Sequence, residues 1–223
     1  MAWISHVCLG AQNLYEAAYR LREETGLESY DGGWFRAGMA NRIVPVGNDQ
    51  YIEVESLIDP RMAERSKGAE YFLDFADYLR RATHEGDALI GWCLRTDTLD
   101  ELRGVARRLR FDVPDGPRRG RIRPDGSQLQ SYAGPPSARV WPRGLPIYQY
   151  RPQPEQAPGL VEVRHRGVRP RGIACLEVGG DEQEVRDWLG PEGAGVPVRL
   201  VGGKPGVRAI RVATDDGDIV IRR

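Results

Sequence analysis

Apolar and polar positions follow the same order at three places along the chain. Each place begins with a short apolar segment that contains the dipeptide Cys-Leu, starting at Cys8, Cys93 and Cys175. A polar turn follows, and apolar residues then recur every three or four positions, the spacing of a helix with one buried face. This spacing predicts helices over residues 14–24, 99–109 and 181–189. Residues suited to cap a helix N-terminus stand at the three starts: Asn13, Thr98 and Asp181.

Three more strands are predicted after each helix, because short apolar segments alternate there with turns rich in Gly, Asn and Asp. They cover 30–35, 41–46 and 51–57, then 120–123, 128–132 and 145–150, then 196–201, 207–213 and 218–221. The chain therefore repeats the order βαβββ three times, over residues 1–58, 88–151 and 171–223. A helix over residues 69–83 is predicted between the first two units, and a Pro-rich connector precedes the third.

The composition narrows the class of protein. The 223 residues include 27 Gly and 16 Pro, which favours many short strands joined by turns. The 32 basic and 32 acidic residues cancel, whereas a nucleic-acid-binding protein usually carries a basic excess. No apolar run approaches the roughly 20 residues of a membrane span, and the first residues do not resemble a signal peptide. Together with three cysteines that cannot all pair, this predicts a cytoplasmic protein with no nucleic-acid or membrane partner.

Several stretches of the first two units resemble a known superfamily. They are Ile4-Ser-His-Val, Asp31 to Gly47, Tyr51-Ile-Glu-Val-Glu55, Ile90 to Asp97, Arg123-Pro-Asp-Gly126 and Leu145 to Tyr150. In order and spacing over residues 1–151 they resemble the vicinal oxygen chelate superfamily, and within it the glyoxalase-like domain proteins. The resemblance implies an α+β fold in which two βαβββ modules build one domain, with eight strands in a curved, incomplete barrel around a cavity. Residues 171–223 would then form an additional half-module.

The resemblance also implies two kinds of function. Enzymes of the superfamily hold a divalent metal ion that two substrate oxygens chelate, and they catalyse isomerisation, epoxide opening, extradiol ring cleavage or epimerisation. Other members bind and sequester drugs without chemistry. The sequence therefore suits a metal-assisted lyase, isomerase or dioxygenase acting on a small oxygen-rich molecule. The alternative is a metal-free protein that binds such a molecule.

Four positions match the superfamily's metal ligands: His6, Glu53, Gly91 and Gln149. Strand alternation supports this grouping, since His6 shares a face of its strand with Ile4 and Cys8, and Glu53 shares a face with Tyr51 and Glu55. Gly91 has no side chain, and Gln149 stands where the enzymes usually carry Glu. The expected set is therefore His6, Glu53 and Gln149 around Zn, Ni, Mn or Fe, with Glu53 and Gln149 as catalytic residues. In the alternative, His6 makes a hydrogen bond to Glu53 or Gln149 and no metal binds.

Three further residues are candidates for binding the small molecule. Asn41 matches an asparagine of the family, and it either caps a turn or donates a hydrogen bond to a ligand carbonyl. Arg121 and Arg123 alternate along one strand, where they either form a solvated face or bind a carboxylate or phosphate through two hydrogen bonds each. Cys8 is interpreted as a buried core thiol, with a nucleophilic role as the less favoured reading.

The third unit carries apolar residues at the ligand positions, Ile173 and Val220, so it adds no metal ligand of the family type. Its sheet must cover an apolar face. Three arrangements satisfy this need: the sheet packs on the barrel, pairs with its copy in a homodimer, or remains as a decayed duplicate.

Overall fold

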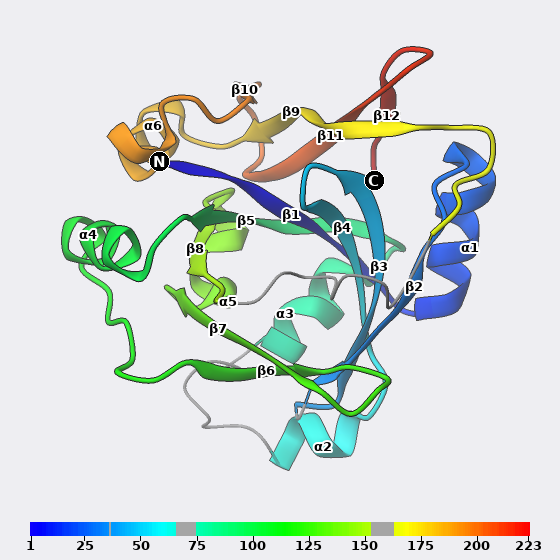
Figure 1. Ribbon diagram of the computed structural model, residues 1–223, viewed down its shortest axis with the longest axis horizontal. Helices are drawn as coiled ribbons and strands as arrows, with labels where there is room; N and C mark the ends of the chain where they lie inside the picture. Colours follow the sequence, from blue (N-terminus) through cyan, green and yellow to red (C-terminus); the bar gives the residue numbers. More distant parts are fainter. Residues whose placement is uncertain (36, 66–74, 153–162) are drawn as a thin grey trace.

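The computed structural model describes residues 1–35, 37–65, 75–152 and 163–223 (Figure 1). The first module consists of β1 (Ala2–Ala11), α1 (Leu14–Thr25), β2 (Tyr30–Phe35), β3 (Met39–Gly47) and β4 (Gln50–Leu57). Helix α1 begins where predicted because the Asn13 side chain accepts the N–H groups of Tyr15 and Glu16. It ends at Gly26, whose φ of 74° is the left-handed conformation that favours glycine.

The second module consists of β5 (Ala88–Thr96), α4 (Leu99–Leu109), β6 (Arg118–Ile122), β7 (Gln128–Gly134) and β8 (Ile147–Tyr150). The Thr98 side chain caps α4 by accepting the N–H of Glu101, as the sequence predicts. Two short helices that were not predicted, α5 (Ser137–Val140) and the 3₁₀ helix η1 (Trp141–Arg143), lie between β7 and β8. They place the Trp141 indole inside the barrel.

The eight strands follow the order β1-β4-β3-β2-β6-β7-β8-β5 around the barrel. Within each module the first and last strands pair in parallel, β1 with β4 and β5 with β8. The modules meet through a long antiparallel pairing of β1 with β5 and a short one of β2 with β6, at Trp34 and Ile122. That short contact closes the ring that the resemblance left incomplete, and the α+β fold with paired modules is confirmed.

A β-bulge interrupts β1 next to the candidate ligand. Ile4 pairs with Leu94 and His6 pairs with Cys93, which leaves Ser5 as an extra residue. Because the bulge adds a residue, the side chains of Ser5 and His6 both reach the barrel interior, where their polar atoms meet.

Helices α2 (Pro60–Arg65) and α3 (Phe75–Ala82) connect the modules. The predicted helix over residues 69–83 agrees with α3, while its residues 69–74 lie outside the described part of the chain. Phe75 and Leu79 are buried at the helical spacing the sequence shows. Helix α3 contacts β1, β4, β5 and α5, so it covers part of the barrel interior.

The third unit consists of β9 (Pro170–Gly179), α6 (Glu182–Leu189), the 3₁₀ helix η2 (Pro191–Gly193), β10 (Val198–Leu200), β11 (Gly206–Thr214) and β12 (Ile219–Ile221). The chain order βαβββ is as predicted, but the strands pair in the order β10-β9-β11-β12. Its first and last strands are therefore separated by β11, so Ile173 and Val220 are not brought together as His6 and Glu53 are. This sheet lacks the arrangement that builds the site in the first two modules.

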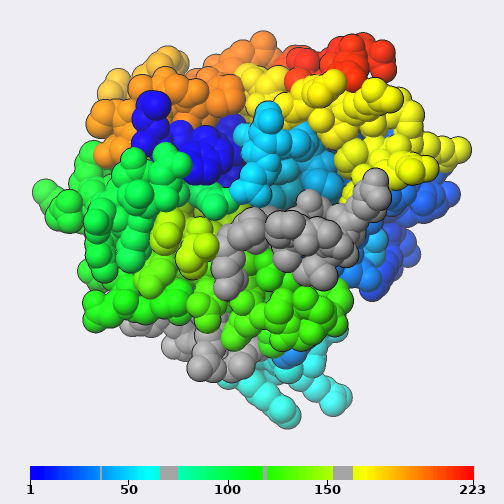
Figure 2. Space-filling view, in the orientation of Figure 1, coloured from blue at the N-terminus to red at the C-terminus, as the bar shows by residue number. Residues whose placement is uncertain are grey.

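The sheet of the third unit packs on the outside of the barrel (Figures 1 and 2). Strand β9 lies against β3, and β11 lies against β5. Its buried apolar residues belong to the same core as the barrel: Ile173, Leu176, Val178, Val207, Ile210, Val212 and Ile221. Of the three arrangements that the sequence left open, packing on the barrel therefore covers the apolar face. None of the described helices is long and apolar enough to cross a bilayer.

Candidate functional site

The interior of the barrel holds a cavity of about 100 Å³. Polar and charged side chains from five strands line it, together with apolar ones from α3, η1 and the barrel wall. The polar, thiol and charged groups are His6, Cys8, Tyr51, Glu53, Glu55, Cys93, Arg121, Ser131, Gln149 and Arg151, with Ser137 from α5. We call this space the barrel cavity.

His6 and Glu53 face each other in the barrel cavity. The Nε2 atom of His6 lies 3.3 Å from Oε2 of Glu53, and both side chains are more than nine-tenths buried. The side-chain amide of Asn41 donates a hydrogen bond to the other carboxylate oxygen, Oε1. Asn41 therefore orients Glu53 toward His6, and it does not cap a turn.

The other ring nitrogen of His6, Nδ1, also has a hydrogen-bond partner. The hydroxyl Oγ of Ser5 lies 3.0 Å from Nδ1, and Gln149 and Arg151 each donate a hydrogen bond to that hydroxyl. With both acceptor sites of Ser5 used, its O–H donates to Nδ1, so the ring proton sits on Nε2 and faces Glu53. The ring of Tyr51 stacks on the imidazole at a centroid distance of 4.7 Å.

Gln149 reaches His6 from the side that Glu53 does not occupy. Its amide nitrogen lies 3.3 Å from Nδ1 of His6, whereas Glu53 faces Nε2. The structure thus brings all three residues of the expected ligand set together, but on two different atoms of the imidazole. An ion bound at Nε2 would be next to Glu53 and across the ring from Gln149.

The fourth family position, Gly91, is closed by an aromatic ring. A Cβ atom on Gly91 would lie 1.9 Å from the Trp141 indole. The indole N–H donates to the carbonyl of Trp92 at 3.1 Å, which fixes the ring there. No side chain larger than hydrogen fits at position 91 while Trp141 keeps this place.

Glu55 adds a second buried carboxyl group beside Glu53. It is 5% exposed, and its Oε2 atom has no hydrogen-bond partner in the part of the chain that the structure describes. Burial raises the pKa of Glu55 well above its usual range, the charge of Glu53 raises it further, and Arg121 opposes the shift. Burial and the neighbouring charge thus favour the protonated form of Glu55 while no cation lies beside it.

Of the two candidate arginines, only Arg121 lies at the barrel cavity. Arg121 is buried and lines the barrel cavity, whereas Arg123 lies in the turn after β6 and donates to Ser127. Arg123 is not among the described residues that line the cavity. Arg151, which sequence reasoning missed, is 2% exposed and donates to Tyr51 and Ser5. Its position two residues after Gln149, on the same strand face, is the signal that could have found it.

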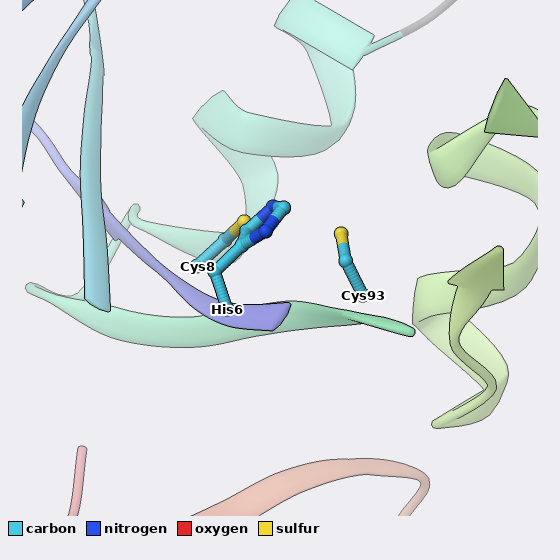
Figure 3. Close-up of side chains that lie close together, drawn as sticks. All are labelled: His6, Cys8 and Cys93. Atoms are coloured by element: carbon cyan, nitrogen blue, oxygen red, sulfur yellow. The ribbon is translucent and has the colours of Figure 1, made fainter. Parts of the chain in front are cut away.

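Cys8 and Cys93 were also missed as parts of the site. A nitrogen of His6 and the sulfur atoms of both cysteines lie within 4.8 Å of one another (Figure 3). Cys8 forms a second such group with Glu53 and Glu55. Burial raises the pKa of both thiols, so they are protonated at neutral pH. The barrel cavity thus holds a buried cluster of His, Cys and Glu side chains that could bind a metal ion.

Comparison with known proteins identifies the family. The model of the glyoxalase-like domain matches residues 4–190 of this chain. The chain belongs to the glyoxalase-like domain family. The resemblance to the vicinal oxygen chelate superfamily is therefore confirmed, and the match extends past the two modules through α6 of the third unit.

One solved structure supports this fold over most of the chain, and others are similar to part of it. A hypothetical protein from Staphylococcus aureus is 14% identical, with a TM-score of 0.66 and coverage of 93% of this chain and 88% of that chain. A Streptomyces coelicolor methylmalonyl-CoA epimerase in complex with 2-nitronate-propionyl-CoA is 15% identical, with a TM-score of 0.44 and coverage of 66% and 94%. The Mycobacterium tuberculosis methylmalonyl-CoA epimerase is 14% identical, with a TM-score of 0.41 and coverage of 66% and 85%. No curated protein matches the chain.

Proposed function

We propose that this glyoxalase-like protein is an enzyme that binds a small oxygen-rich molecule and a divalent metal ion in the barrel cavity. Its reaction is of the lyase, isomerase or oxygenase type. The observation that carries the proposal is the buried pair of His6 and Glu53, with Nε2 and Oε2 3.3 Å apart in a cavity. A neutral nitrogen beside a carboxylate is half of a common metal site. The unpartnered Oε2 of buried Glu55 next to them fits a cation too, because such an oxygen is costly to bury alone.

His6 and Glu53 would hold the ion. Gln149 would have to change its side-chain orientation to reach it. A bound divalent ion polarises the oxygens of a substrate. The protein's own groups supply the rest. Glu55 faces the same cavity with a carboxyl group whose pKa is raised, which suits it to exchange a proton with a substrate oxygen or carbon. Asn41 keeps Glu53 turned toward His6.

The volume and lining of the barrel cavity also limit the size and charge of the molecule that can bind. Pockets for drug-sized ligands have volumes of about 300–1,000 Å³, and the barrel cavity has about 100 Å³. Two buried arginines, Arg121 and Arg151, line it. The protein is therefore suited to a ligand of a few heavy atoms with negatively charged oxygens, such as a short carboxylate.

The test is the metal content of protein purified without chelators, measured by mass spectrometry of the elements. Wild type should carry about one divalent ion per chain, and His6→Ala and Glu53→Gln should each lower the affinity at least about tenfold. Glu177→Gln is the matched control, because it changes a buried carboxylate in the outer sheet. Wild type without metal, and without uptake when metal is added, would overturn the metal part of the proposal.

A metal-free binding protein is the second candidate, and one observation favours it. Asn41, Ser5 and Gln149 already occupy His6 and Glu53 with hydrogen bonds that need no ion. In that case short carboxylates should raise the melting temperature equally with and without a chelator. If their effect disappears with the chelator, the enzyme with its metal is the better account.

A further inference from the structure

The barrel cavity contains a ligand set that the superfamily's positions do not include. The antiparallel register of β1 and β5 pairs His6 with Cys93 and Cys8 with Gly91. Alternation along β1 puts His6 and Cys8 on one face of the strand. Figure 3 shows the imidazole and both thiols on the same side of these adjacent strands, with Cys93 across from the other two. Their donor atoms lie within 4.8 Å of one another.

Glu53 lies beside this group, in a second group that shares Cys8. Its Oε2 atom lies 3.3 Å from Nε2 of His6, and a Glu53 oxygen lies within 4.8 Å of the Cys8 sulfur. In a tetrahedral zinc site with Zn–S of about 2.3 Å and Zn–N of about 2.0 Å, neighbouring donors are about 3.3–3.8 Å apart. The three donors of His6, Cys8 and Cys93, which lie within 4.8 Å of one another, therefore need to approach by about 1 Å to enclose an ion, and Glu53 has to turn toward them.

A buried thiol alone is an ordinary core residue, so the two cysteines need support from a separate observation. Glu55 provides it. Its side chain is more than nine-tenths buried, it lines the same cavity, and its Oε2 has no hydrogen-bond partner among the described residues. It also belongs to the group that Cys8 forms with Glu53. An unpartnered carboxyl oxygen in the cavity beside Cys8 is a place where a cation stabilises the fold.

We propose that His6, Cys8, Cys93 and Glu53 together bind one zinc-type divalent ion, with both cysteines as thiolate ligands. The proposal rests on the proposed function and specifies its metal centre. Trp141 closes Gly91, so Cys93 is the residue through which β5 reaches the ion. Each cysteine gives its thiol proton to solvent as its sulfur binds the metal. His6 binds through Nε2 by moving its ring proton to Nδ1, so one ion releases two protons, both from thiols. Two sulfur donors favour Zn²⁺ or Co²⁺ over Mn²⁺.

Cobalt reports sulfur ligation directly, because a thiolate bound to Co²⁺ gives an intense charge-transfer absorption in the near ultraviolet. The full chain is titrated with Co²⁺ under reducing conditions, and binding is followed separately by equilibrium dialysis. We expect one Co²⁺ per chain, a charge-transfer band, and loss of both when excess Zn²⁺ is added. Cys8→Ser and Cys93→Ser should each weaken the band and lower Co²⁺ affinity at least about tenfold. Cys175→Ser is the matched control and should change neither, because Cys175 lies on β9 outside the barrel cavity.

The outcomes separate this proposal from the proposed function. Stoichiometric Co²⁺ without the band, or a band that persists in the Cys8→Ser/Cys93→Ser double variant, overturns thiolate ligation and leaves a metal held by His6 and Glu53. No bound Co²⁺ or Zn²⁺ overturns both. Because the serine variants could fail to fold, zinc X-ray absorption of the wild type is the second measurement. A sulfur shell at about 2.3 Å supports the proposal, and a shell of nitrogen and oxygen alone overturns it.

Discussion

Two buried carboxyl groups, Glu55 in the barrel cavity and Glu177 in the outer sheet, respond to folding in opposite directions. Burial and the charge of Glu53 raise the pKa of Glu55. Burial also acts to raise the pKa of Glu177, but the guanidinium groups around it, Arg199 first, outweigh burial and lower the pKa. The difference lies in the number of cations that contact each carboxylate.

The two groups should therefore give opposite pH dependences in metal-free protein. A carboxyl group with a raised folded pKa stabilises the fold at low pH and loses this effect as pH rises from 4.5 through the folded value. A lowered pKa stabilises above 4.5 and loses the effect as pH falls. We define the difference as the melting temperature of wild type minus that of the variant. For Glu55→Gln this difference should fall as pH rises, and for Glu177→Gln it should rise. Differences that do not change with pH would contradict both assignments.

A substitution at Gly91 tests the position of the Trp141 indole. A methyl group at position 91 would overlap the indole, so Gly91→Ala should lower the free energy of unfolding by about 1–3 kcal/mol. Gly104→Ala on α4 is the control, because a Cβ there meets only the end of Arg107 at 3.9 Å. A helical alanine should raise stability by about 0.5–1 kcal/mol. Urea unfolding measures both changes, and equal effects would show that Trp141 does not occupy this place.

The helices and strands of the paired modules follow from local signals in the sequence. Asn13 and Thr98 cap their helices as predicted, because an N-cap needs only a side-chain oxygen and the backbone that follows it. Alternation placed Glu53 on one strand face with Tyr51 and Glu55 for a similarly local reason, and all three line the barrel cavity. The strand order of the third unit had no such signal, because the same βαβββ pattern can pair its strands in more than one order.

Long-range packing explains what the sequence did not reveal about the site. Trp141 fills Gly91 only because α5 and η1 fold into the barrel, and these short helices have no apolar periodicity. Cys93 meets His6 through the register between two strands far apart in sequence. Such a register depends on the bulge at Ser5, which no pattern in β1 predicts.

The contact between α4 and α6 joins the barrel to the third unit. Arg108 donates hydrogen bonds to the carbonyls of Asp187, Trp188 and Leu189 at the end of α6. Removing it breaks these hydrogen bonds and leaves the Tyr148 hydroxyl as a donor to Trp188 and Leu189, so the loss should cost about 1–3 kcal/mol. Arg108→Ala should therefore lower the free energy of unfolding and speed amide hydrogen exchange in α6. The neighbouring, exposed Arg107 supplies the control, and an equal effect of Arg107→Ala would contradict this role.

At the scale of the whole molecule, the barrel and the outer sheet share one continuous core. The full chain should therefore unfold in a single cooperative transition, with equal calorimetric and van't Hoff enthalpies. Two separate transitions would mean that the outer sheet is an independent unit. A homodimer and a cytoplasmic location stay predictions from the sequence.

The central claim is that the barrel cavity is a metal centre built around His6 and Glu53. Anomalous diffraction at the zinc absorption edge, from crystals grown with Zn²⁺ and no chelator, tests it most directly. The account predicts one strong peak between His6, Cys8, Cys93 and Glu53. A cavity without a peak, in which His6 still donates its Nε2 proton to Glu53, would contradict it.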